Sequence, residues 1–310
     1  MSTPAIQWYP GHIAKAERQL QDQLKRVDVV LEVRDARIPI ATHHPKVRHW
    51  IGEKARILVL NRVDMISSDS RQQWQAWFRS QGDRPHFVDA KKGKGIGPIA
   101  QAAKSAGKAM NERRISRGMR PRPVRAVVIG FPNVGKSALI NKLLKKKVVE
   151  SARRPGVTRQ LRWVRISDEL ELLDAPGVLP SKLTDQDAAL KLAICDDIGQ
   201  AGYDNQRVAA AFLDLLKTLP SYHVNGLPTD QGDHTKQQEI FDEHDVQTKT
   251  IVKSLDKRYQ VDPSIYSGES YIAKIADSQH KGDKERVARQ ILNDFRTGIL
   301  GSVSLEFPPS

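Results

Sequence analysis

The chain has 310 residues, of which 39% are hydrophobic and 28% charged, an ordinary composition for a globular protein long enough to form two domains. A single cysteine, Cys195, excludes an intramolecular disulfide, and no apolar run approaches the length of a membrane span. No export signal is visible at the N-terminus. We therefore expect a cytoplasmic protein without membrane contact, and we interpret Cys195 as a core residue.

The net charge of +14 is unevenly spread along the chain. Residues 1–200 carry +17, whereas residues 201–310 carry −3. A basic first part predicts a polyanionic partner, and a plain solvated basic surface is the alternative.

Strands and helical patterns alternate through the first 103 residues. In chain order we predict a helix at 13–24, a strand at 27–33, an amphipathic stretch at 47–51, a strand at 57–60, a helix at 71–81 and a strand at 86–88. Such alternation is typical of a parallel sheet covered by helices on both faces.

A basic segment at 104–125 follows, which we interpret as a helix and then an exposed connector rich in arginine. After it we predict a strand at 126–129, a helix that starts at Ser137, and strands at 161–166 and 170–173. The basic cluster Lys145-Lys146-Lys147 lies between these elements.

Beyond about residue 183 the pattern becomes helical. Thr184 is a candidate N-cap, and a polar stretch at 224–245 predicts a loop. Apolar stripes at helical spacing predict core-facing helices, and they comprise Val208, Phe212, Leu215 and Leu219, and then Val287, Ile291, Phe295 and Ile299.

The stretch Gly130-Phe131-Pro132-Asn133-Val134-Gly135-Lys136-Ser137 fits the phosphate-loop pattern G-x-x-x-x-G-K-S/T. It lies between an apolar strand and a helical segment, so backbone N–H groups and the helix dipole would face a phosphate. We expect Lys136 to reach the β- and γ-phosphates and the Ser137 hydroxyl to ligate Mg²⁺.

The predicted triphosphate site also needs three residues that follow the phosphate loop in the chain, which are Thr158, Asp174 and Gly177. Thr158 supplies a second hydroxyl for Mg²⁺, and Asp174 supplies a carboxylate at the end of a strand. The Gly177 N–H would contact the γ-phosphate.

Base selection is predicted from segments before the phosphate loop. Asp64, in Asn61-Arg62-Val63-Asp64, offers a carboxylate for the N1–H and amino group of guanine, which adenine cannot satisfy. Asn61 would brace the loop and reach the base edge, while the Ala90 N–H, in Asp89-Ala90-Lys91, would contact the guanine carbonyl.

These motifs resemble those of translation-factor-type GTPases, but the base-recognition segments precede the phosphate loop. That order is similar to the circularly permuted GTPases. With Trp8-Tyr9-Pro10-Gly11-His12 and the segment 33–39, the chain resembles the YlqF/RbgA ribosome-biogenesis branch. The resemblance implies an α/β P-loop GTPase fold with permuted strand order at 1–182, divided into 1–103, 104–125 and 126–182. A smaller all-helical domain at 183–310 would follow.

The resemblance also implies a set of site residues. For nucleotide binding it points to Asn61, Arg62, Asp64, Asp89, Ala90, Lys91, Asn133, Val134, Gly135, Lys136, Ser137, Ala138, Thr158 and Gly177. For Mg²⁺ it points to Ser137, Thr158 and Asp174, for K⁺ to Asn133, and for catalysis to His12, Lys136 and Val178.

Two of these positions depart from the family pattern. Arg62 stands where Lys is usual, and its aliphatic stem is expected to lie along the base plane. Val178 stands where Ras-like enzymes carry the water-orienting Gln, and an aliphatic side chain cannot orient water, so we expect slow intrinsic hydrolysis. His12 would then orient the attacking water, a structural turn residue being the alternative.

The resemblance therefore implies a monomeric GTPase that binds GTP and GDP and assists late assembly of the large ribosomal subunit. It would bind rRNA in the GTP state and leave after hydrolysis, with Arg113–Arg125 and Lys145–Lys147 as contacts to RNA phosphates. The alternatives are a GTP-gated RNA-binding module with little turnover, a P-loop ATPase or small-molecule kinase, and a signalling GTPase with a protein effector.

Overall fold

The computed structural model describes residues 13–144, 162–174, 185–198, 203–219 and 243–309. The chain divides into two compact units, one made of Met1–Gly202 with Glu306–Ser310 and the other of Tyr203–Leu305. The sequence places this boundary at residue 182, so the first unit also takes in helix α6 (Gln186–Cys195).

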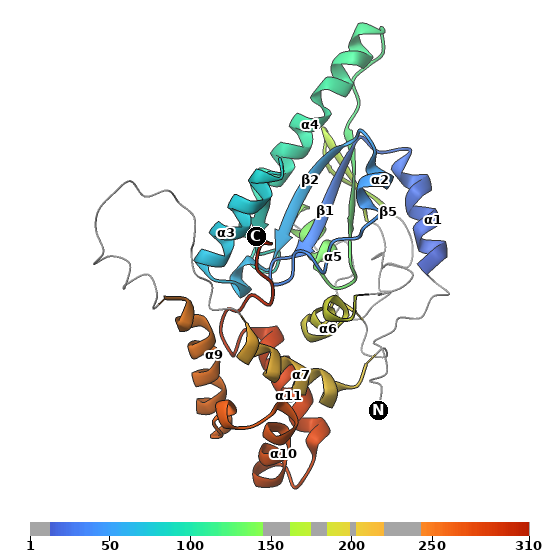
Figure 1. The fold of residues 1–310 in the computed structure, drawn as a ribbon. Coiled ribbons are helices and arrows are strands. Elements are labelled where there is room, and N and C mark those ends of the chain that lie inside the picture. Colours follow the sequence, from blue (N-terminus) through green and yellow to red (C-terminus); the bar gives the residue numbers. More distant parts are fainter. Residues whose placement is uncertain (1–12, 145–161, 175–184, 199–202, 220–242, 310) are drawn as a thin grey trace, which may run out of the picture. The chain divides into compact units, whose positions relative to one another are not determined.

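A six-stranded sheet with the order β3-β2-β1-β4-β6-β5 forms the centre of the first unit (Figure 1). All neighbours are parallel except β5 and β6, which are antiparallel. The strands are β1 (Val29–Asp35), β2 (Ala55–Asn61), β3 (His86–Val88), β4 (Val124–Gly130), β5 (Arg162–Ser167) and β6 (Leu170–Asp174). The predicted α/β sheet is therefore confirmed, and most strands are one to three residues longer or shifted at their ends.

Helices cover both faces of this sheet. In the parallel register, Val30 of β1 lies beside Arg56 of β2 and Val127 of β4, so these side chains share one face. The helices α1 (Ile13–Leu24), α2 (Val47–Ile51) and α3 (Ser68–Ser80) pack on that face through two apolar clusters.

The other face is covered by α4 (Ile96–Ser116) and α5 (Lys136–Leu143). Gly107 of α4 lies so close to β4 that an added Cβ would be 2.2 Å from Val124, and only glycine allows this approach. The helix predicted after Lys104 thus begins eight residues earlier, at Ile96, because its first turns pack on the sheet.

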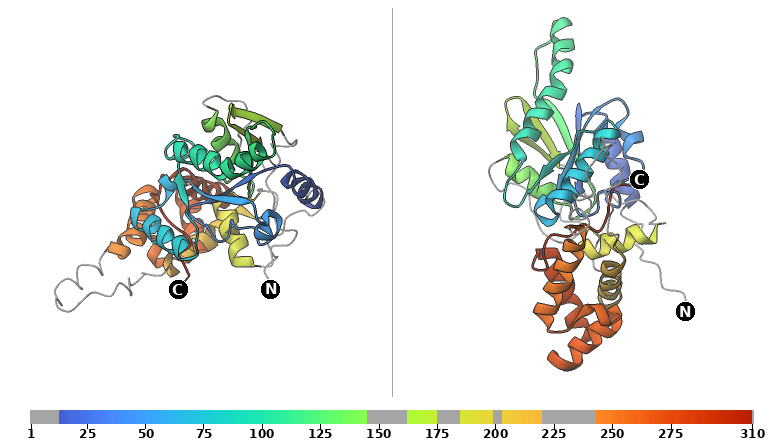
Figure 2. Two further views of the ribbon diagram at one scale, coloured as in Figure 1. Left: turned by 90° about the horizontal axis from the view of Figure 1, so that it is seen from above. Right: turned by 60° about the vertical axis from the view of Figure 1, so that its left-hand side comes forward.

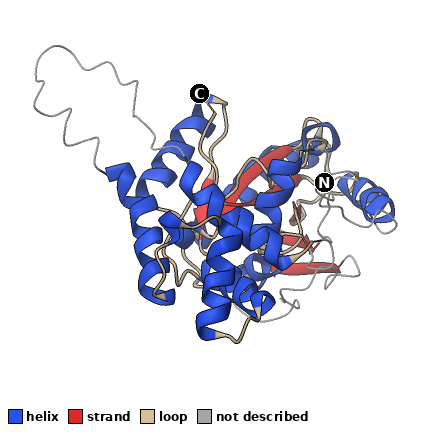
Figure 3. Ribbon diagram, turned by 60° about the horizontal axis from the view of Figure 1, so that its bottom comes forward, coloured by secondary structure: helices blue, strands red, loops and turns tan. Residues whose placement is uncertain are grey.

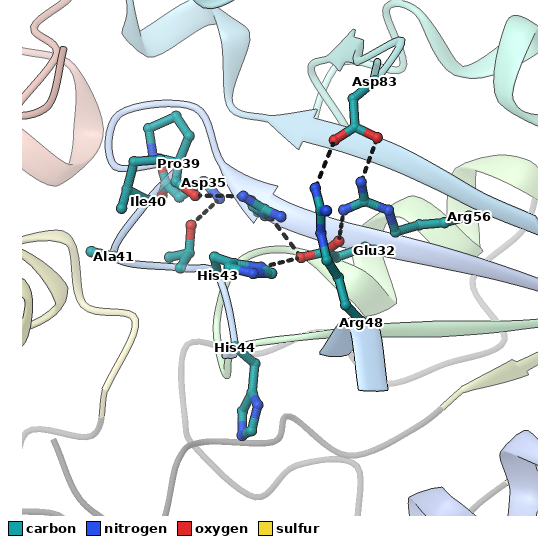
Figure 4. A network of polar contacts seen from close by, with 12 residues as sticks. Glu32, Asp35, Pro39, Ile40, Ala41, His43, His44, Arg48, Arg56 and Asp83 are labelled. Carbon is teal, nitrogen blue, oxygen red and sulfur yellow. Dashed lines mark hydrogen bonds and ion pairs between the residues drawn. The ribbon is translucent and has the colours of Figure 1, made fainter. Parts of the chain in front are cut away.

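A buried ionic network lies on the face that carries α1, α2 and α3 (Figure 4). Glu32 of β1 accepts hydrogen bonds from Arg34 Nε and Arg56 Nη1, each at 2.7 Å, and His43 Nδ1 lies 2.9 Å away. Burial raises the pKa of Glu32, but the Arg34 guanidinium outweighs this effect and holds the pKa well below its ordinary range. His44 points away from Glu32 and packs its ring on Trp50 instead.

The second unit consists of helices where it is described, and the strands belong to the first unit (Figure 3). Its elements are α7 (Asn205–Thr218), α9 (Glu243–Tyr259), the short 3-10 helix η4 (Pro263–Ile265), α10 (Gly268–Gln279) and α11 (Lys284–Thr297). No described helix has the length and apolar character needed to cross a membrane.

Several helix predictions need correction. The N-cap of α6 is Asp185, whose carboxylate accepts the N–H groups of Asp187 and Ala188, and the predicted cap Thr184 lies outside the described residues. In α7, Leu216 is buried where Leu215 was expected, because the inward face continues from Val208 and Phe212 at a spacing of four.

The last predicted core positions also differ. Ile299 is 53% exposed because α11 ends at Thr297 with a left-handed Gly298 cap, so the helical spacing does not continue to it. Of the loop predicted at 224–245, residues 243–245 belong to α9 and the rest lies outside the described residues. Cys195 is fully buried, as predicted.

The end of the chain returns to the first unit through Glu306. Its carboxylate accepts the N–H groups of Ile40 at 2.7 Å and Ala41 at 3.1 Å, and Lys191 Nζ lies 3.6 Å away. The side chain is only 7% exposed and Ala41 is buried, so removal of this carboxylate would leave at least the Ala41 N–H without a partner away from solvent.

The Glu306→Ala variant is expected to unfold with a free energy about 1–3 kcal/mol lower than that of the wild type, because the buried Ala41 N–H and the part-buried Ile40 N–H lose their acceptor. Urea denaturation followed by circular dichroism measures the difference. Glu53→Ala, at an exposed position, is the control and should change little. Equal stability of the two variants would contradict the anchoring role of Glu306.

Candidate functional site

The parallel register brings the carboxyl ends of the strands together at one edge of the sheet. Asp35 of β1 lies beside Asn61 of β2, and Val33 lies beside Gly130, the first residue of the phosphate loop. At the end of β6, Asp174 lies beside Val128 of β4. The motifs that the permuted chain separates therefore converge where α/β sheets bind their ligands.

The phosphate loop turns directly from β4 into α5. Gly130, Asn133 and Gly135 have φ values of 151°, 57° and 98°, and Gly135 caps the helix. The buried Lys136 ammonium donates to the carbonyl oxygens of Phe131 at 2.8 Å and Gly130 at 3.3 Å, so it lies against the loop. A turn followed by a helix N-terminus leaves backbone N–H groups without intrahelical partners, which suits an anion.

Asn61 connects the phosphate loop with the segment after β3. Its Nδ2 donates to the Val134 carbonyl at 2.7 Å, and its Oδ1 accepts the Ala90 N–H at 3.0 Å. A Cβ on Gly135 would lie 2.2 Å from this Nδ2, which explains why glycine is needed there. The Ala90 N–H is the group predicted to meet a guanine carbonyl, and in this structure its hydrogen bond goes to Asn61.

The candidate base-recognition residues lie just beyond the ends of β2 and β3. Asp64 belongs to the 3-10 helix η2 (Val63–Met65), with its side chain 31% exposed and Lys92 Nζ at 3.8 Å. Asp89 is buried and accepts the Lys92 N–H at 2.9 Å, so it shapes the turn that follows β3. Lys91 is exposed.

Arg62 has a second contact that sequence reasoning missed. Its backbone is left-handed, with φ 64°, and its Nη2 donates to the Asn133 carbonyl at 2.6 Å. The same guanidinium lies 3.4 Å from Asp35 Oδ2 and 3.6 Å from Asp197 Oδ1. The sequence predicts only that the aliphatic stem lies along the base, so the polar end of Arg62 is a finding of the tertiary structure.

Three further buried residues surround this guanidinium and were not among the predicted site residues. The Arg37 guanidinium donates to both carboxylate oxygens of Asp35, from Nη2 at 2.7 Å and from Nε at 3.0 Å. Its Nη2 also donates to the Cys195 carbonyl at 3.1 Å. Burial raises the pKa of Asp35, but Arg37 and Arg62 outweigh it and lower the pKa below its ordinary value. Burial, reinforced by the charge of Asp35, raises the pKa of Asp197. The segment Arg34-Asp35-Ala36-Arg37 is the only sequence signal for this cluster.

Some predicted site residues lie outside the described residues. They are His12, Lys145, Lys146, Lys147, Thr158, Gly177 and Val178, and the side chain of Asp174 is likewise not described. Ser137, Val134 and Ala138 follow or line the phosphate loop, with Val134 buried and the other two half-buried.

The donors at this edge of the sheet suit a hard cation. A hydroxyl, from Ser137, and a carboxylate at a strand end, from Asp174, are oxygen ligands of the kind that Mg²⁺ prefers. The backbone of Asp174 lies beside Val128, two residues before the phosphate loop begins. Within the described residues, no cluster of three or more His, Cys, Asp or Glu side chains could hold a metal by itself.

Comparisons with known proteins show that the chain is similar to GTPases. Residues 125–259 match the family model described as 50S ribosome-binding GTPase. The chain is 41% identical to "Ribosome biogenesis GTPase A" of Bacillus cereus, over 73% of this chain and 78% of that protein. It is 39% identical to the protein of the same name from Bacillus pumilus, over 76% and 84%.

A solved structure extends the similarity to the whole fold. The crystal structure of GNP-bound YlqF from T. maritima superposes with a TM-score of 0.54 at 24% identity, covering 96% of this chain and 99% of that one. At this level of identity the similarity concerns the fold.

The Asp64→Ala variant is expected to lose about 10- to 100-fold in affinity for guanine nucleotides while its affinity for ATP stays the same, because a carboxylate can pair with guanine donors that adenine lacks. Fluorescence titration with labelled GDP, competed by GTP and ATP, measures both affinities. Asp69→Ala, in the first turn of α3, is the control. An unchanged ratio of GTP to ATP affinity would contradict the role of Asp64.

Proposed function

We propose, since the chain belongs to the ribosome biogenesis GTPase A family, that this ribosome-assembly GTPase acts in late maturation of the large ribosomal subunit. It binds rRNA in the GTP state and leaves after hydrolysis. The observation that supports its nucleotide-binding part is the amide of Asn61, which connects the phosphate loop with the base-recognition segment. A phosphate loop alone would fit any nucleoside triphosphate, and this connection gives it a neighbouring site for the base.

The proposed chemistry assigns a role to each part of the site. Lys136 and the N-terminus of α5 hold the β- and γ-phosphates. Mg²⁺ bound with the nucleotide neutralises phosphate charge, and Ser137, Thr158 and Asp174 are the residues that would hold it. No glutamine follows the Asp174–Gly177 segment, since Val178 stands there, so the intrinsic hydrolysis is slow.

His12 and Asn133 are proposed to support hydrolysis. His12 orients the attacking water, a role that suits an imidazole with a pKa near neutrality. The Asn133 Nδ2 donates to the Asp196 carbonyl at 2.7 Å, so the donor end of this amide is turned toward the end of α6. Its Oδ1 is the atom that would hold K⁺, because oxygen is the acceptor of the amide.

The proposed rRNA contact is the basic tip, which we define as residues 113–120. The C-terminal part of α4 extends beyond the sheet and carries this tip (Figure 2). Arg113, Arg117 and Arg120 are exposed there. The Arg122 guanidinium instead donates to both carboxylate oxygens of Asp28, at 2.8 Å and 2.9 Å. The Arg125 Nε lies 3.4 Å from the Glu171 carboxylate. Of the six arginines predicted to face RNA, we therefore assign the contact to the three exposed ones.

The wild-type protein is expected to hydrolyse GTP faster when large ribosomal subunits are added, and faster in K⁺ than in Na⁺. The His12→Ala variant is expected to keep its GTP affinity and to lose the stimulation. Phosphate release with and without subunits measures the turnover, and co-sedimentation with a GTP analogue, with GDP and without nucleotide measures the binding. Absent stimulation of the wild type would favour a GTP-gated RNA-binding module, and unchanged stimulation of the variant would contradict the role of His12.

The Arg117→Ala/Arg120→Ala double variant is expected to bind large subunits more weakly, because two phosphate contacts are lost. The slope of log K against log salt concentration should become shallower by about 1.4 to 1.8. Binding measured by co-sedimentation at several salt concentrations gives the slope. The matched control is Arg79→Ala/Arg84→Ala, which removes the same charge from exposed positions near α3. Equal slopes for the two double variants would contradict the assignment of the basic tip.

A further inference from the structure

The phosphate loop is held from outside by the end of α6, a segment that belongs to no nucleotide motif. Asn133 Nδ2 donates to the Asp196 carbonyl at 2.7 Å, and the Asn133 carbonyl accepts from Arg62 Nη2 at 2.6 Å. Asp197, next along the chain, lies 3.6 Å from the same Arg62 nitrogen. The side-chain nitrogen of Asn133 is thus bonded to Asp196, and its backbone carbonyl is bonded to Arg62, which also lies near Asp197.

Residues with a strained backbone conformation lie at this contact between the phosphate loop, Arg62 and the end of α6. Among the described residues, five that are not glycine have a positive φ, and three of them are Arg62 at 64°, Asn133 at 57° and Asp196 at 64°. A left-handed conformation is unfavourable for residues with a Cβ and persists where surrounding contacts impose it. Asn133 bonds to both of the others, through its carbonyl to Arg62 and through its side chain to Asp196, so part of the contacts that impose these conformations is shared.

The cluster is anchored in the core of the first unit. Asp35, Arg37 and Asp197 are fully buried, and Arg37 donates to the Cys195 carbonyl in the last turn of α6 at 3.1 Å. Buried guanidinium and carboxylate groups need their partners, because an unpaired charge in this environment is strongly destabilising. The end of α6 and the end of β1 therefore hold a fixed position around the Arg62 side chain.

The chemistry of the cluster requires arginine at position 62. The Arg62 Nε faces Asp35, while its Nη2 faces both Asn133 and Asp197. A planar guanidinium reaches these groups with two nitrogens at once, whereas a lysine offers one ammonium nitrogen. Lysine is the usual residue of the family at this position, and its single nitrogen could not face all three groups at once.

We propose that Arg62 is a positioning residue for the phosphate loop and that Asp35 and Asp197 hold it there, so that the end of α6 sets the affinity for nucleotide. The proposal needs only nucleotide binding and goes beyond the ribosomal part of the proposed function.

The test compares four proteins, which are wild type, Arg62→Lys, Asp197→Asn and the double variant. Dissociation constants and dissociation rates of labelled GDP are measured without ribosomes, so the result is independent of the ribosomal proposal. Arg62→Lys, although it restores the usual family residue, should raise the dissociation constant about tenfold. Asp197→Asn keeps the side-chain volume and should raise it about threefold. Because Asp197 acts through Arg62, the double variant should match Arg62→Lys alone.

The control variant is Arg56→Lys, which alters another half-buried guanidinium, paired with Glu32 and Asp83 and away from the loop. It should lower the melting temperature of the nucleotide-free protein at least as much as Arg62→Lys while leaving GDP affinity unchanged. Three results would overturn the proposal. The first is an unchanged GDP affinity in Arg62→Lys. The second is a dissociation constant of the double variant that is raised by the product of the two single effects. The third is a loss of GDP affinity in the control equal to that in Arg62→Lys.

Discussion

A single amide group, that of Asn61, joins the two parts of the nucleotide site. Its nitrogen bonds to the phosphate loop and its oxygen to the segment after β3. The partners are 73 and 29 residues away along the chain, so only the aligned ends of parallel strands bring them together. An amide suits this position because it donates and accepts at once, which a carboxylate cannot do.

The permuted order of the motifs is compatible with the fold for the same reason. In a parallel sheet the ligand site is formed by the strand ends, and β1, β2 and β4 deliver Asp35, Asn61 and Gly130 to one edge in any chain order. The order of the chain does decide which segment follows the site. Here α6 follows β6 in the described chain, and its last turn packs its carbonyl groups against the Asp35–Arg37 pair and Asn133.

Buried charge serves two different purposes in the first unit. On the face covered by α1, α2 and α3, Glu32 pairs with Arg34 and Arg56 between two apolar clusters (Figure 4). At the strand ends, Asp35 pairs with Arg37 and Arg62 beside the phosphate loop, and Asp197 lies 3.6 Å from Arg62. Both networks carry the desolvation cost of buried ions, and the second bonds directly to the phosphate loop through Arg62 and the Asn133 carbonyl. The proposed positioning role follows from this connection.

The sequence by itself determined the class of fold, the phosphate loop and the approximate positions of the strands, because these depend on local patterns: apolar strands at their spacing, glycines in a tight turn and a lysine at the start of a helix. Helix limits such as Ile96 and the cap Asp185 depended on packing and on a choice between neighbouring polar residues, and the sequence placed them only approximately. The contacts of Arg62 were decided by tertiary structure alone. Asp197 is 135 residues away from Arg62, and no spacing rule relates two residues that meet only because a helix ends against a strand end.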